Sequence, residues 1–173
     1  DADLFIIDDG AGGTNRKTTA ARIKTYIGGT GLAEADQFRL SASIGAGTNA
    51  DITSNLERID TTGSPKVGTG MSESSGIFTF PSTGMYLVNV HCVFSSDAND
   101  AMAYVNTRYT ANNSSYVDGA YAVAANKSGS AENQSGCSSI MIDVTNTTNV
   151  KVKFATASMG SGTSLSGNSD VNY

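Results

Sequence analysis

The chain has 173 residues, of which 16% are charged, and its formal net charge is −5. This length supports one ordinary hydrophobic core with a small additional module. The acidic balance argues against a nucleic-acid partner, and the absence of any apolar run of roughly 18 to 20 residues argues against membrane insertion. Nineteen glycines and only two prolines favour a turn-rich, mainly β domain over a helical one.

Residues 1–35 form the first predicted module, which consists of a strand, a turn and a short helix. The apolar run LFII precedes the glycine-rich turn DDGAGG. Five later residues fall on one helical stripe: Ala20, Ala21, Ile23, Lys24 and Ile27. Two glycines then follow, where a helix ends. Four basic side chains can pair within the module or across subunits, and we expect them to form an adaptor contact: Arg16, Lys17, Arg22 and Lys24.

Residues 36–173 alternate between apolar and polar side chains and predict a series of strands. The alternation places strands near residues 38–44, 77–80, 86–94, 101–105, 115–124, 140–144 and 150–154. Gly, Asn and Ser fill the segments between them. Short strands at this spacing indicate an antiparallel β-sandwich.

The strand predicted over residues 85–94 has two faces of different character. Its even positions are apolar and predict contact with the core. Its odd positions carry a mixture of side chains: Met85, Leu87, Asn89, His91 and Val93. This mixture predicts a face covered by a neighbouring subunit, and a solvent-exposed face with scattered apolar residues is the alternative.

The segment SGIFTFPSTGMYLVNV resembles the signature of the C1q globular head and its tumour necrosis factor relatives. In that family a Gly-x-Phe-x-x-Pro-x-x-Gly-x-Tyr pattern joins two strands of a jelly roll, and the matching residues here are Gly76, Phe78, Pro81, Gly84 and Tyr86. NVKVKFATAS, residues 149–158, resembles a later strand of the same family. The resemblance implies a homotrimer in which the odd face of residues 85–94 lies near the threefold axis. It also implies a final aromatic-rich strand, which either begins at residues 171–173 and is cut short or comes from a neighbouring chain.

Residues 1–32 resemble a connector found in tail and fibre proteins of bacteriophages, especially marine ones. Together, the two resemblances imply a virion structural protein on the particle surface: the distal trimeric domain of a tail fibre or spike. The first module would join other virion proteins, and the β-domain would recognise a host cell-surface glycan or protein. A capsid decoration or head-fibre protein that stabilises the shell is the alternative. A polysaccharide depolymerase ranks last, because it usually needs a larger carboxylate-lined groove.

The candidate receptor contacts are aromatic and amide side chains expected mostly in loops: Tyr109, Asn112, Asn113, Tyr116 and Tyr121. We predict no enzymatic activity, since His91 is the only histidine and lies inside a predicted strand. Four carboxylates are conceivable partners for glycoside hydrolysis: Asp97, Asp100, Glu132 and Asp143. Of these, Asp143 is expected on an exposed face.

The segment SSDANDAM offers hard oxygen ligands for calcium. These are Asp97, Asn99 and Asp100, but the spacing lacks the rest of a recognised calcium loop. We therefore predict no cofactor, with Ca²⁺ as the one candidate ion.

The two cysteines, Cys92 and Cys137, each lie in or beside a predicted strand. A disulfide between them and two buried free thiols both fit the sequence. Free thiols are the preferred interpretation, because a buried cysteine behaves as a small hydrophobic residue.

Overall fold

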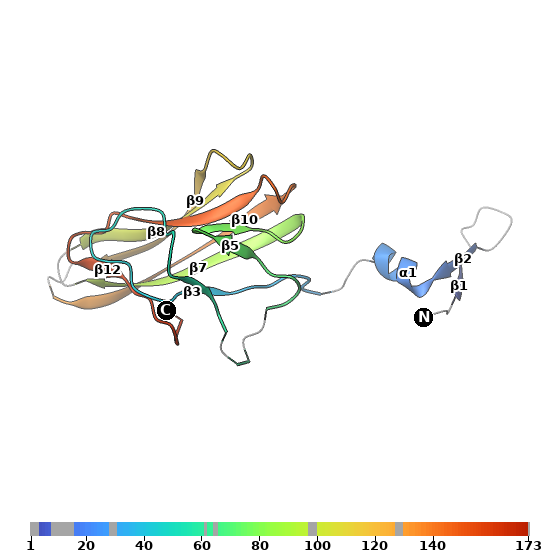
Figure 1. The fold of residues 1–173 in the computed structure, drawn as a ribbon, viewed down its shortest axis with the longest axis horizontal. Helices are drawn as coiled ribbons and strands as arrows, with labels where there is room; N and C mark the ends of the chain where they lie inside the picture. The colour runs from blue at the N-terminus through green and yellow to red at the C-terminus, as the bar shows by residue number, and fades with distance from the viewer. Residues whose placement is uncertain are drawn as a thin grey trace.

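The computed structural model describes residues 4–7, 16–27, 31–60, 62–63, 66–96, 100–126 and 130–172. Its fold is mainly β, with antiparallel sheets. Two of these sheets lie against each other as the layers of a β-sandwich, and a small strand-helix unit precedes them (Figure 1). The predicted fold class is therefore confirmed at the level of an antiparallel, mainly β structure.

One layer of the sandwich is a five-stranded sheet of order β5-β6-β11-β8-β9. Its strands are β5 (Ser72–Ser74), β6 (Ile77–Thr79), β8 (Asp100–Thr110), β9 (Val117–Asn126) and β11 (Lys151–Ala157). Residues 50–52 extend this sheet, because they exchange backbone hydrogen bonds with residues 154–156 beyond the end of β6.

The other layer is a three-stranded sheet of order β10-β7-β12. It contains β7 (Gly84–Ser96), β10 (Glu132–Val144) and β12 (Thr163–Leu165). All 13 residues of β10 pair with β7 in one unbroken register. A separate hairpin joins β3 (Phe38–Leu40) to β4 (Leu56–Arg58), and Ile44 bridges to Leu165 at the edge of β12.

The space between the layers holds two clusters of buried apolar side chains. Phe94, Val105 and Leu165 belong to the first cluster, and Phe78, Phe80 and Val152 belong to the second. Leu56 and Phe154 pack against both clusters and so connect them. The even positions of β7 face this core, as the alternation predicted, and Cys92 and Phe94 are buried there.

The GIFTFP segment has a clear physical role in this core. Gly76 has a φ of +82°, and an added Cβ would lie 2.1 Å from the carbonyl oxygen of Ile52. Only glycine fits such a conformation and such a close backbone approach. Phe78 and Phe80 then enter the core, and the Phe80 ring lies 4.7 Å from the Tyr86 ring, measured between centroids.

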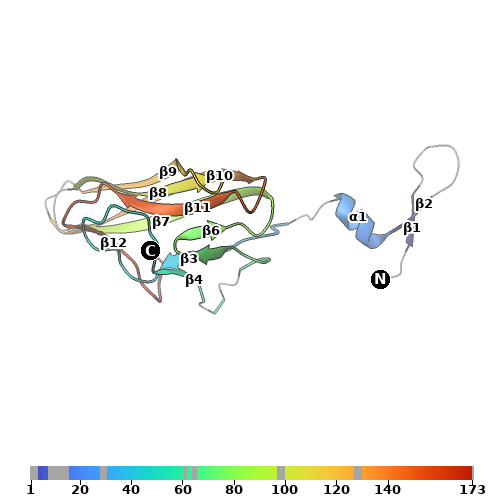
Figure 2. The ribbon, with the colours of Figure 1, turned by 45° about the horizontal axis from the view of Figure 1, so that its top comes forward.

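The N-terminal unit consists of β1 (Leu4–Ile7), β2 (Arg16–Thr19) and α1 (Ala20–Ile27). The predicted first strand and the helix are confirmed. β2 pairs with β1 in antiparallel register, and the hydroxyl of Thr19 caps the helix by accepting a hydrogen bond from the Arg22 N–H. In Figures 1 and 2 this unit lies beyond one end of the sandwich.

The structure departs from the sequence predictions in its shortest strands. β2, β4, β5 and β12 were not predicted, because three or four residues carry too little alternation to be detected. The sheet that contains β7 receives its last strand from Thr163–Leu165, beside residues 94–96 of β7. Val171, where a final strand was expected to begin, lies after β12 and outside the strands, and Tyr173 lies outside the described residues. Contacts of the sandwich also begin slightly before residue 36, because Ala35 bridges to Val67.

Candidate functional site

The outward face of β7 and β10 brings together all five residues predicted at a subunit interface. Because the register is unbroken, the odd positions of β10 lie directly opposite those of β7. We call this surface the β7–β10 face, and its members are Met85, Leu87, Asn89, His91 and Val93 of β7, with Ser135, Cys137, Ser139, Met141 and Asp143 of β10. Val93 is half-buried, and the other nine are exposed.

The β7–β10 face is apolar at one end and polar at the other. Met85, Leu87 and Met141 are 60%, 62% and 64% exposed. Asn89 and Ser139 form the next cross-strand pair, and the Ser139 hydroxyl lies 2.8 Å from Asn89 Oδ1. Asp143, beside Met85, is the only carboxylate among the ten residues. An exposed patch with three large apolar side chains and so little charge is typical of a surface that another protein covers.

The two cysteines lie on opposite faces of their sheet and are both free. Cys92 is buried, and burial raises the pKa of its thiol to about 11. Cys137 is exposed and lies opposite His91 on the β7–β10 face. The prediction of free thiols is confirmed, but the prediction that both are buried is wrong, because Cys137 occupies an odd position of β10 and points away from the core.

A second group of side chains lies on the outward face of the five-stranded sheet. We call it the tyrosine–charge cluster, and its members are Asp51, Tyr104, Asn106, Arg108, Tyr116, Asp118, Tyr121 and Lys153. Arg108 links two carboxylates, since its Nε donates to Asp118 Oδ1 and its Nη1 to Asp51 Oδ1, each at 3.1 Å. The Lys153 ammonium lies 2.6 Å from Asp51 Oδ2 and 4.2 Å from the centre of the Tyr116 ring.

Tyr121 is held in a fixed position within the tyrosine–charge cluster. Its hydroxyl donates to Asp118 Oδ2 at 2.8 Å, and its ring meets the Tyr104 ring edge-on with centroids 4.9 Å apart. The hydrogen bond to Asp118 raises the pKa of Tyr121. The pKa of Asp118 is lowered, first by a hydrogen bond from Asn106 and then by the one from Tyr121. Asp118 therefore remains an anion that orients three neighbours.

Asp51 is the second carboxylate of the tyrosine–charge cluster. Burial raises the pKa of Asp51, but hydrogen bonds and charges from Lys153 and Arg108 outweigh that effect, so its pKa lies below the ordinary value. Burial, followed by the Asp51 charge, raises the pKa of Tyr116. Two carboxylates and two basic groups thus balance one another across this sheet face.

The predicted receptor contacts are only partly brought together. Tyr116 and Tyr121 belong to the tyrosine–charge cluster, whereas Tyr109 packs against the second core cluster. Asn112 stabilises its own loop, because its Oδ1 accepts hydrogen bonds from the N–H groups of Ser114 and Ser115. Asn113 adopts a positive φ of 56° in the same turn. Tyr109 therefore supports the core, and Asn112 and Asn113 shape the turn that follows β8.

Sequence reasoning missed most of the charged members of the tyrosine–charge cluster. Asp51, Arg108, Asp118 and Lys153 are distant in sequence, and only the order β11-β8-β9, together with the pairing of Asp51 to Ala155 of β11, places them side by side. The one available signal was the polar face of β11, on which Lys151 and Lys153 alternate with apolar residues. Their partners could not be identified without the strand register.

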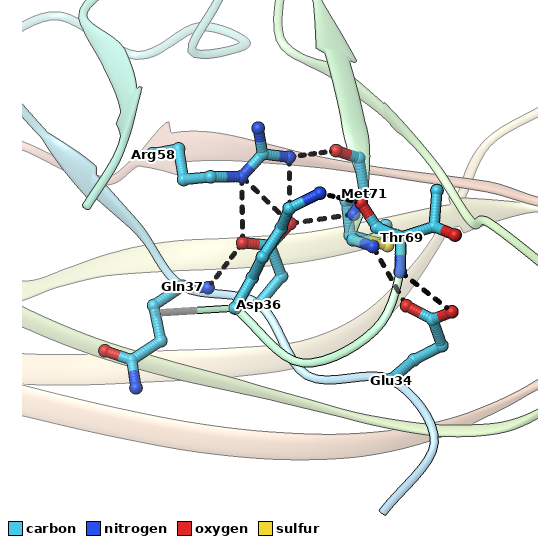
Figure 3. Close-up of polar contacts among 8 residues, drawn as sticks. Glu34, Asp36, Gln37, Arg58, Thr69 and Met71 are labelled. Carbon is cyan, nitrogen blue, oxygen red and sulfur yellow. Dashed lines mark hydrogen bonds and ion pairs between the residues drawn. The ribbon is translucent and has the colours of Figure 1, made fainter. Parts of the chain in front are cut away.

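A third polar cluster fixes the segment that leads into the sandwich (Figure 3). Asp36, which has a 4% exposed side chain, accepts bidentate hydrogen bonds from Arg58 at 2.9–3.2 Å and one from the Met71 N–H at 2.7 Å. Glu34 accepts from the N–H groups of Thr69 and Gly70 at 3.1 and 2.9 Å. Residues 34–36 are thereby tied to residues 69–71.

The electrostatics of Asp36 follow from these contacts. Burial raises the pKa of Asp36, but hydrogen bonds from Arg58 and Met71, together with the Arg58 charge, lower it below the ordinary value. An open hollow of about 490 Å³ lies beside this cluster, between Phe38, Leu56 and Arg58 and residues 69–73. Arg58 and Glu73, which line it, are already engaged by Asp36 and by the Gly76 N–H. Both charged side chains that line the hollow, Arg58 and Glu73, therefore already have partners within the chain.

Among the described carboxylates considered for hydrolysis or calcium, no three are grouped with one another. Glu132 and Asp143 lie at opposite ends of β10, about 36 Å apart at the usual rise per residue. Asp100 accepts a hydrogen bond from the Gly160 N–H at 2.6 Å, while Asp97 and Asn99 lie outside the described residues. Asp143 is exposed, as predicted. Within the described ranges, no three His, Cys, Asp or Glu side chains are grouped as metal ligands would be.

The predicted adaptor residues all belong to the N-terminal unit. Arg22 is exposed on α1. The backbones of Arg16, Lys17 and Lys24 lie in β2 and α1, and their side chains fall outside the described part of the structure. Their proposed contacts with other proteins thus stay a prediction.

The chain's function has to be inferred from these surfaces. Across the residues that the structure describes, we find no helix with the length and apolarity needed to cross a membrane. Comparison with protein-family models and with curated proteins finds no match to this chain.

Proposed function

We propose that this chain is a homotrimeric structural and recognition domain of a virion appendage, such as a bacteriophage tail fibre or spike. The observation that carries the proposal is the β7–β10 face, where Met85, Leu87 and Met141 remain at least 60% exposed in the single chain. Covering a leucine or methionine side chain completely stabilises an assembly by about 1.5–3 kcal/mol. In a trimer this stabilisation is gained in each of the three copies of the face.

The occupant of the β7–β10 face is a second copy of the same chain. The face has one carboxylate and no lysine or arginine, so identical copies meet with little charge repulsion. Its Asn89–Ser139 pair adds polar groups that can hydrogen-bond across an interface. The unbroken pairing of β7 and β10 also presents one continuous surface to a neighbouring copy.

The strand order supports a jelly roll of the C1q and tumour necrosis factor type. The β10-β7-β12 sheet continues to residues 40–44 through the bonds of Ile44 to Leu165 and of Asn168 to Leu40. This sheet would be the inner one, next to the threefold axis. β5-β6-β11-β8-β9 would then form the outer sheet.

The virion location is proposed from the resemblance of residues 1–32 to phage connectors. The N-terminal unit lies beyond one end of the sandwich in both views, which suits an adaptor to other virion proteins (Figure 2). The outer sheet, with its tyrosine–charge cluster, would then be available for a host glycan or protein.

The assembly is tested by the native mass of residues 1–173, measured by light scattering over a range of concentrations. We expect three times the mass of one chain. A monomer at every concentration would overturn the proposal, because the β7–β10 face would then be an ordinary solvent-exposed surface.

A further inference from the structure

We infer that the tyrosine–charge cluster is a binding site for a neutral saccharide, with the Tyr121 ring as its platform. This inference rests on the proposed function, because it names the ligand class that the appendage would recognise. It assigns polar contacts to Arg108 and Asp118, which lie opposite each other on β8 and β9.

The first argument is the exposed and oriented Tyr121 ring. Tyr121 is 48% exposed, while its hydroxyl bond to Asp118 and its edge-on contact with Tyr104 restrict its rotation. A rigid aromatic surface loses little conformational entropy when a ligand covers it. The C–H faces of a pyranose ring are apolar and pack well against such a surface.

The second argument is the remaining hydrogen-bonding capacity beside this ring. Arg108 has five N–H donors, and its contacts with Asp51 and Asp118 engage only its Nε and Nη1. Asp118 receives hydrogen bonds from Arg108, Tyr121 and Asn106, and a carboxylate has about four acceptor positions. Adjacent hydroxyls of a sugar, which both donate and accept, match an arginine and a carboxylate placed side by side.

Asn106 provides an independent sign of an incomplete polar site. It is only 7% exposed, and its Oδ1 has no hydrogen-bond partner among the described residues. Its position on β8 is directly opposite Tyr121 on β9. A buried acceptor without a donor costs about 1–3 kcal/mol. Neighbouring atoms cover this oxygen in the structure, so a ligand hydroxyl would recover part of that cost by displacing them and donating to it.

The charge balance selects an uncharged ligand. Asp51 and Asp118 are paired with Arg108 and Lys153, so the four groups cancel. An acidic sugar would have to compete with these carboxylates for the same two basic groups. A neutral saccharide makes contacts without breaking an ion pair.

The test uses the full chain on an immobilised array of neutral oligosaccharides that end in glucose, galactose, mannose or N-acetylglucosamine, together with sialylated and uronate-containing counterparts. We expect binding to at least one neutral saccharide. Tyr121→Ala should weaken that binding by about tenfold, as expected for the loss of an aromatic contact. Tyr121→Phe, which keeps the ring, should stay within about threefold of the original chain.

Val123→Ala is the matched control, because Val123 lies on the same outward face of β9 and is 44% exposed. It should bind as the original chain does. Binding that Tyr121→Ala leaves unchanged, binding only to acidic saccharides, or no saccharide binding by a trimeric chain would each overturn the inference. In the last case, adhesion of the trimer to host cells through a protein would preserve the proposed function, whereas a monomeric chain would remove it.

Discussion

Leu87 on β7 and Met141 on β10 lie directly opposite each other in the sheet, and they are 62% and 64% exposed. A cross-strand pair of this kind normally packs side by side and shields part of its own surface. Here both side chains remain exposed on the face of the sheet that points away from the core. The pair is the centre of the apolar end of the β7–β10 face.

Leu87→Asp should convert the proposed trimer into a monomer. The substitution places a carboxylate beside Met141 and repeats it around the axis, where the charges would be buried without partners. Light scattering measures the mass. Met102→Asp is the control, since Met102 is a 43% exposed residue of β8 in the other sheet. An unchanged mass for Leu87→Asp would remove the β7–β10 face from the interface.

The cysteines should report the same interface through their reactivity with a thiol reagent at about pH 8. The thiolate is the reactive form, so Cys92, buried and with its pKa raised to about 11, should react slowly in every variant. Cys137 should be protected in the trimer and react quickly in Leu87→Asp. The reaction is followed by absorbance. If Cys137 reacts at the same rate in the original chain and in Leu87→Asp, the β7–β10 face is not covered.

Asp36→Asn should lower the free energy of unfolding at about pH 7 by about 2 kcal/mol, because Arg58 and the Met71 N–H lose a charged acceptor. The folded pKa of Asp36 is lowered, so its contribution is present above the unfolded pKa of about 3.9 and disappears as the pH falls through the folded pKa. Urea unfolding should show that the free energies of unfolding of the original chain and of Asp36→Asn differ less at about pH 3 than at about pH 7. Asp170→Asn, at an exposed position near the end of the described chain, is the control. A difference that persists in acid would show that the Asp36 charge is not responsible.

Gly76→Ala should destabilise the chain by about 2–4 kcal/mol, since strain at positive φ adds to a clash with the backbone of Ile52. Gly63→Ala separates the two effects. Gly63 has a φ of +94°, but an added Cβ would meet nothing within 4 Å, so the cost should be about 1 kcal/mol. If urea unfolding gives the same loss of stability for Gly76→Ala and Gly63→Ala, the close approach to Ile52 is not the reason that position 76 requires glycine.

Removal of residues 1–32 should leave the trimer intact. The β7–β10 face and the contacts of Glu34 and Asp36 all lie after the deleted segment. Light scattering of the shortened chain should again give three times its own chain mass. Loss of the trimer would place the assembly contacts in the N-terminal unit instead.

The long strands were predicted in position, because alternation is a strong signal, but not in full length: only residues 140–144 of β10 and 101–105 of β8 were predicted. β7 shows this clearly, and the same alternation correctly separated its core positions from Leu87 and His91. Met141 was missed as an interface residue although it alternates with Ile140 and Ile142 in β10. The sequence alone does not show that β10 pairs with β7, so it could not place Met141 on the same exposed face as Leu87.

Side-chain clusters that join distant segments could not be predicted. Asp36 and Arg58 are 22 positions apart and carry no periodic signal, and their meeting depends on the β3–β4 pairing. The same limit applies to Asp118 and Asp51, which are connected only through Arg108. Tyr121 was identified as a contact residue from its chemistry, whereas the groups that orient it required the register of β8 and β9.

In the proposed trimer, one sheet of the sandwich serves assembly and the other serves recognition. If the β7–β10 faces meet around a threefold axis, the outer sheets point away from it and carry three copies of the Tyr121 platform to three sides of the particle. Each copy can then release its sugar rapidly while another stays attached. Multivalent attachment of this kind can exceed the single-site affinity by about 10²–10⁴-fold when the spacing of the target matches. Such a protein would bind a cell surface that carries many copies of the saccharide much more tightly than it binds the same saccharide free in solution.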